Sequence, residues 1–173
     1  MKSNLLMDFS VDKENKTISV KREFGAELPL VWDAYTKSEI LDQWWAPKPW
    51  RARTKIMDFR EGGHWLYAMV GPEGEEHWAR ADYLEIDRHK GFRAKDGFAD
   101  EDGNLNRQMP QSYWQFSFST AADGTLVTNL ITFDELQHLE QTLEMGFKEG
   151  FVAALENLDQ WLDNPDHVGS ASE

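Results

Sequence analysis

The chain has 173 residues, of which 40% are hydrophobic and 13% aromatic, so we expect one folded domain with a sizeable core rather than a disordered chain. Its formal net charge of −13 argues against nucleic acid or an anionic membrane as a partner, because both favour Lys and Arg. There is no cysteine, no apolar run of about 18 residues and no leader-like apolar N-terminus, which excludes a disulfide framework and predicts a cytoplasmic protein without a membrane span.

The first part of the chain predicts a β-hairpin followed by two short helices. Weak alternation over 5–11, a turn at 12–15 and clear alternation over 16–24 are typical of two strands joined by a short loop. Leu28 and the proline after it begin a short helix, because proline suits a first turn. A second helix begins at Ser38 and ends before the next prolines.

The middle of the chain predicts a meander of strands with period-two alternation. The expected strands cover 52–59, 64–70, 76–86, 91–99, 111–120 and 125–133. The polar stretch 100–110 contains a Gly-Asn pair and predicts a loop.

Apolar residues in the region 136–162 recur at steps of three and four, which predicts one amphipathic helix of about seven turns. Gly146 and Gly150 would lie inside it, where glycine costs about 1 kcal/mol relative to alanine. Either the helix contacts the sheet or the short helices closely there, or the missing side chains leave room for a ligand beside Phe147 and Phe151. The two explanations are compatible.

The order of these elements predicts an α+β fold. We expect a curved antiparallel β-sheet that wraps around one long C-terminal helix, with two short helices after the first strands. We divide the chain into an N-terminal hairpin extension (1–16), a single domain (17–162) and a flexible tail (163–173). The first strand is an exposed edge on which a second copy could pair, so a homodimer is one expected assembly.

Several stretches of the chain carry a family resemblance. In order, they are Val20–Ala26, Val31–Thr36, Trp44–Pro47, Met57–Gly63 with Trp65, Tyr83–Ile86, Asp123–Thr125, and Gly146–Phe151 with Leu155, Leu158 and Leu162. This ordered set resembles the START-like, helix-grip (SRPBCC) superfamily, and within it the family named after the C-terminal domain of the Hsp-ninety ATPase activator (Aha type). The resemblance implies a START-like domain with an apolar cavity between the sheet and the last helix. Ala81 departs from the pattern, because relatives usually have glycine there.

Large rings are concentrated in this chain, four tryptophans and a tyrosine between residues 31 and 50 alone. They either fill the core or line a pocket for an apolar guest. The candidate ligand-binding residues are Trp44, Trp45, Trp65, Tyr67, Trp114, Phe116, Asn129, Phe147 and Phe151. Because neighbouring helical residues point about 100° apart, only one of Trp44 and Trp45 is expected to face a ligand.

Polar residues also occur among apolar neighbours. They are Arg22, Asp58, His77, Glu85, Gln111 and Asn129. A buried charge must be paired, so each either forms a structural ion pair or hydrogen bond, or anchors the polar end of a bound molecule. Asn129 is the clearest candidate for an anchor. We expect no catalytic residue, metal site or cofactor, since the five histidines are scattered without metal-ligand spacing and no nucleophile motif is present.

Three functions fit these observations. The favoured one is a binding protein for a small hydrophobic or aromatic molecule, without a demonstrable reaction. The second, by analogy with the namesake of the family, is a co-chaperone-like interaction module of the stress response with a chaperone partner. The third is a cyclase- or aromatase-type enzyme, which would need two or more convergent titratable groups in the cavity. An interaction module would instead show a filled core and an exposed apolar patch.

Overall fold

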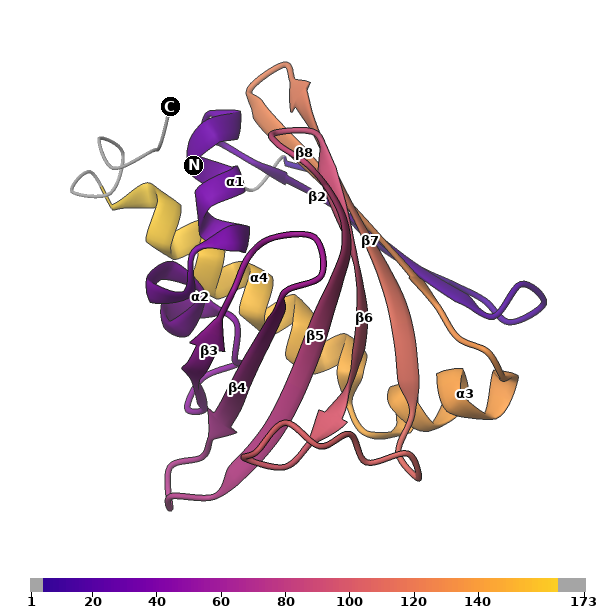
Figure 1. The fold of residues 1–173 in the computed structure, drawn as a ribbon. Helices are drawn as coiled ribbons and strands as arrows, with labels where there is room; N and C mark the ends of the chain where they lie inside the picture. Colours follow the sequence, from indigo (N-terminus) through magenta and orange to yellow (C-terminus); the bar gives the residue numbers. More distant parts are fainter. Residues whose placement is uncertain (1–4, 165–173) are drawn as a thin grey trace.

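The computed structural model describes residues 5–164 and contains one antiparallel sheet of eight strands with four helices. The strands are β1 (Met7–Asp12), β2 (Thr17–Phe24), β3 (Arg51–Met57), β4 (His64–Val70), β5 (Glu76–Asp87), β6 (Gly91–Ala99), β7 (Gln111–Ala121) and β8 (Gly124–Thr132), in the spatial order β1-β2-β8-β7-β6-β5-β4-β3. The helices are α1 (Leu28–Thr36), α2 (Ser38–Trp44), α3 (Leu136–Glu144) and α4 (Phe147–Asp163). Figure 1 shows the sheet curving around α4, with α1 and α2 beside that helix. The predicted α+β helix-grip architecture is confirmed.

The predicted boundaries of the domain, at residues 17 and 162, both lie within the described part of the chain. In the N-terminal extension, β1 pairs with β2 from Met7 opposite Arg22 to Asp12 opposite Thr17, and it forms one edge of the sheet. At the other end, α4 includes Asp163, and residues 165–173 of the predicted tail lie outside the described part, as do residues 1–4. Between residues 5 and 164, no helix is both long enough and apolar enough to cross a membrane.

Buried and less buried side chains alternate along β2, and the buried ones pack the sheet against α4. Ile18, Val20 and Phe24 are fully buried on the face that meets the helices. Arg22 lies on the same face and is also buried, but its guanidinium contacts Glu156 at 3.3 Å and Asp159 at 3.6 Å on α4. This residue therefore forms a structural ion pair that fixes α4 on the sheet, as expected for a buried charge.

The long C-terminal helix is confirmed as α4, but it begins later than the sequence predicts. The predicted single helix is interrupted: α3 ends at Glu144 and α4 begins at Phe147. Between them, Gly146 adopts a left-handed conformation with φ of +88°. Hydrophobic spacing misses this break because α3 and α4 both present apolar residues to the protein interior on either side of the glycine. The expectation of a close contact at Gly146 is wrong, since no atom lies within 4 Å of a Cβ built there. This glycine serves the backbone turn.

Alanine substitutions at Gly146 and Gly150 should change the free energy of unfolding in opposite directions. Gly146→Ala is expected to lower the free energy of unfolding by about 1 kcal/mol, because a side chain is strained at this positive φ. Gly150→Ala is expected to raise it by up to about 1 kcal/mol, because Gly150 lies within α4 and its Cβ would meet only Pro47 Cγ at 3.7 Å. Urea denaturation measures both values, and equal signs would contradict this explanation.

Candidate functional site

A cavity of about 470 Å³ lies between the sheet and the C-terminal helices. Its aromatic wall consists of Trp45 after α2, Tyr67 of β4, Trp114 of β7, and Phe147 and Phe151 of α4. Its outer part is formed by Pro47 and Trp50 after α2, by the start of β5 and by the break between α3 and α4. Binding sites for small molecules typically have volumes of about 300–1,000 Å³ and apolar walls, so this cavity has the size and lining of a binding site.

The rings of the cavity wall hold one another in fixed orientations. The Trp45 indole Nε1 donates a hydrogen bond to Tyr67 Oη at 3.0 Å. Trp45 and Phe151 meet edge to face with ring centroids 5.9 Å apart, and Trp114 and Phe151 do so at 5.6 Å. Phe147 and Phe151, one turn apart on α4, are stacked at 5.3 Å. Edge-to-face and stacked rings are favourable geometries, so the wall is preorganised.

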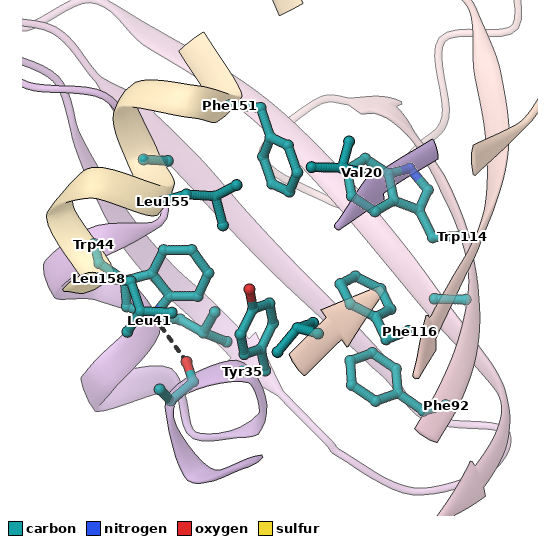
Figure 2. Packing of buried hydrophobic residues seen from close by; sticks show 14 of the residues in the cluster. Val20, Tyr35, Leu41, Trp44, Phe92, Trp114, Phe116, Phe151, Leu155 and Leu158 are labelled. Carbon is teal, nitrogen blue, oxygen red and sulfur yellow. Dashed lines mark hydrogen bonds between the residues drawn. The ribbon is translucent and has the colours of Figure 1, made fainter. Parts of the chain in front are cut away.

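The two neighbouring tryptophans have different environments. Trp45 is half-buried and lines the cavity, whereas Trp44 is 1% exposed and lies outside the cavity lining. Figure 2 shows Trp44 between α1 and α4, where its Nε1 donates to the Ala34 carbonyl oxygen at 2.8 Å. Its ring also packs edge-on against Tyr35 at 4.9 Å. Trp44 is therefore part of the core that joins the short helices.

The remaining candidate residues separate into two groups. Trp65 and Phe116 line a second, smaller void of about 30 Å³, which has room for about one water molecule. Trp45 and Trp114 border both spaces. Asn129 borders neither of them, because it is buried on β8 between Val20 of β2 and Phe116 of β7. The larger cavity thus brings together Trp45, Tyr67, Trp114, Phe147 and Phe151 from the predicted set.

Asp96 is the acidic residue of this site, and the sequence interpretation missed it. It lies on β6 on the same side as Phe92, Ala94 and Phe98, and it borders both the cavity and the smaller void. The signal was present in the alternation of β6, which places every second residue on the inner face. The carboxyl is half-buried, and its accessible surface belongs to the cavity wall.

The surroundings of Asp96 are poorly suited to a charge. Burial, followed by repulsion from the Asp82 carboxylate, raises its pKa from 3.8 to about 7. Between residues 5 and 164, no ion pair or hydrogen bond to the Asp96 side chain is formed. The pKa values of Tyr67 and Tyr83 are raised mainly by burial and secondly by the negative charge of Asp96. Both hydroxyls therefore stay neutral. Asp96 is the one lining residue of the described chain with an acidic side chain.

The other polar candidates are mostly explained by local contacts. Asp58 pairs with Arg60 at 2.8 Å, and Glu85 pairs with Arg93 at 2.9 Å. His77 is exposed at the outer part of the cavity, where its ring lies 5.3 Å from that of Trp50. These two carboxylates are therefore structural, and His77 alone among the exposed polar candidates borders the cavity.

Comparison with known proteins identifies the family of this chain. The family described as "Activator of Hsp90 ATPase homolog 1-like protein" matches residues 26–163. The chain belongs to this family. The expected resemblance is thereby confirmed, and the fold is the START-like helix-grip fold of its relatives.

Solved structures agree with this membership of the Activator of Hsp90 ATPase homolog 1-like family. A protein from Mycobacterium smegmatis is 31% identical, with a TM-score of 0.85 over 92% of this chain and 98% of that one. A protein from Arthrobacter aurescens is 28% identical, with a TM-score of 0.86 over 91% and 92%. One from Staphylococcus epidermidis is also 28% identical, with a TM-score of 0.78 over 89% and 93%. The search of curated proteins finds no match.

Proposed function

We propose that this protein binds a small hydrophobic or aromatic molecule in the cavity between the sheet and α4. The observation that carries the proposal is the 470 Å³ cavity with its preorganised aromatic wall. A packed interior has few spaces larger than a water molecule, since unfilled volume forfeits dispersion contacts. Water in an apolar cavity of this size gains little from the walls, so a hydrophobic molecule of matching size is expected to displace it.

The other functions have less support from these features. An interaction module should have a filled core and a contiguous apolar patch, whereas the large exposed apolar side chains are distributed over β1, β3, β5, β8 and the α3 region. A cyclase- or aromatase-type reaction needs convergent titratable groups, and the cavity wall offers the Asp96 carboxyl with His77 at its outer part. Ligand binding is the function that needs no further group.

The test uses N-phenyl-1-naphthylamine, a neutral aromatic probe whose fluorescence rises in apolar surroundings. With about 17 non-hydrogen atoms at about −0.4 kcal/mol each, it should bind at about −7 kcal/mol, a Kd of about 10 μM. Gly150→Leu places a side chain in the cavity beside Pro47 and should weaken binding at least about tenfold.

Gln160→Leu is the matched control, because it adds the same side chain at an exposed position of the same helix. It should bind the probe like the unmodified protein, and thermal melting verifies that both variants fold. Failure of the unmodified protein to bind the probe, or equal binding by Gly150→Leu, would overturn the proposal.

A further inference from the structure

We propose that the ligand of this cavity is a cation, namely a small alkylamine, with or without an aromatic ring, whose protonated nitrogen pairs with the Asp96 carboxylate. This inference rests on the proposed function and specifies the ligand class. It starts from the position of Asp96, which borders both the cavity and the smaller void behind it. The carboxyl thus lies where the inner end of a guest would come to rest.

Small residues surround Asp96 on the sheet and leave its carboxyl accessible to a guest. The residues directly opposite on the two neighbouring strands are Ala81 of β5 and Ser112 of β7. Ala94 precedes it on the same face of β6 and Phe98 follows it. Two of these four neighbours are alanines and one is a serine, so a ligand group can approach the carboxyl between them.

The protein supplies no cation to this carboxyl. In the part of the chain that the structure describes, the cavity wall contains neither lysine nor arginine. The titratable groups near Asp96 are Tyr35 of α1, Tyr67 of β4, and His77, Asp82 and Tyr83 of β5. Of these, Asp82 forms an ion pair with Arg80 at 2.8 Å. β7 and α4 contribute serine and aromatic rings to the wall but no charge.

The indole donors in the wall are occupied by other acceptors. Trp45 Nε1 donates to Tyr67 Oη at 3.0 Å, and Trp114 Nε1 donates to Ser112 Oγ at 3.0 Å. Neither indole therefore donates a hydrogen bond to the Asp96 carboxylate. Ionising this carboxyl in apolar surroundings is costly unless a cation pairs with it. The ring faces themselves attract cations. A protonated amine satisfies the carboxylate and the rings together, whereas a neutral or anionic guest does not.

The test compares two molecules of nearly equal shape by calorimetric titration at pH 8.5. One is 2-(2-naphthyl)ethylamine, which is mostly cationic there because an alkylammonium has a pKa of about 10; the other is the neutral 2-(2-naphthyl)ethanol. We expect the amine to bind at least about tenfold more tightly. Asp96→Asn should abolish this preference and leave the binding of the alcohol unchanged or stronger. Asp87→Asn, which removes a charge from the exposed end of β5, should keep the preference.

The pH dependence separates a cation from a neutral guest. Amine affinity should rise with pH from 5 to 8.5, because the Asp96 carboxyl must ionise, and it should be flat in Asp96→Asn. An amine that binds no better than the alcohol, or an affinity that rises as the pH falls, would overturn the inference and leave the cavity proposal intact. If N-phenyl-1-naphthylamine binds and neither naphthyl compound does, the inference also fails. If none of the three binds, both proposals fail.

Discussion

Replacing Asp96 by asparagine is expected to raise the free energy of unfolding at pH 8.5 by up to about 4 kcal/mol, and to change it little at pH 4. The pKa of the Asp96 carboxyl is about 7 in the folded protein, against an ordinary value of 3.8 that applies to the unfolded chain. Each pKa unit corresponds to about 1.36 kcal/mol. Between these pH values, the folded protein holds a proton that the unfolded chain releases. Its stability therefore falls as the pH rises through this window. Asparagine has the same shape and no charge, so it removes this loss.

Urea denaturation at several pH values between 4 and 8.5 measures this effect as a difference between the variant and the unmodified protein. The difference should grow from pH 4 to pH 7 and then level off. Carboxyl groups that do not interact with Asp96 titrate equally in both proteins and cancel. Asp87→Asn should give a difference close to zero throughout, because this residue is exposed. A difference that is constant with pH, or a less stable Asp96→Asn protein at pH 8.5, would show that the carboxyl is not held in unfavourable surroundings.

Replacing Trp44 by alanine is expected to lower the free energy of unfolding by about 3–5 kcal/mol. The ring is 1% exposed and packs between the short helices and α4 (Figure 2). Its removal leaves a cavity and also leaves the Ala34 carbonyl oxygen without the hydrogen bond that Trp44 Nε1 donates. The loss combines burial, dispersion contacts and a polar group, so it should exceed that of any half-buried tryptophan.

Trp161→Ala is the control for this change. Trp161 lies on α4, is half-buried, and donates from Nε1 to Gln43 Oε1 at 3.0 Å on α2. Its truncation should cost less, about 1–2.5 kcal/mol, because the partly exposed ring buries less apolar surface than Trp44 does. Chemical denaturation compares the two variants. A Trp44→Ala protein that is as stable as Trp161→Ala would contradict the assignment of Trp44 to the core.

The strands were predictable because half-buried strands carry a period-two signal. The limits of β4 and β6 coincide with the predicted ranges 64–70 and 91–99. The break at Gly146 was not predictable in this way, because apolar spacing continues across it and only the φ of +88° reveals it. The spacing rule for helices predicted that Trp44 and Trp45 would differ, but not which of the two would border the cavity.

The chemistry of the cavity was harder to predict than the fold. Asp96 stands on a predicted strand, but its neighbours across the sheet are Ala81 and Ser112, and strand pairing must be known to bring these small residues beside it. Asn129 was expected to anchor a ligand from the same kind of pattern, and it lies outside the cavity lining because Phe116 and Val20 enclose it. Cavity volume depends on how side chains from seven helices and strands and the loops between them meet, which periodicity does not encode.

The central claim is that the cavity between the sheet and α4 takes an aromatic guest with its amine at Asp96. A crystal structure of the protein grown with 2-(2-naphthyl)ethylamine tests this most directly. We predict the naphthalene ring against Trp45, Trp114 and Phe151, and the nitrogen within hydrogen-bond distance of the Asp96 carboxylate, about 2.7–2.9 Å. A ligand bound elsewhere, or a cavity filled by its own side chains, would contradict the claim.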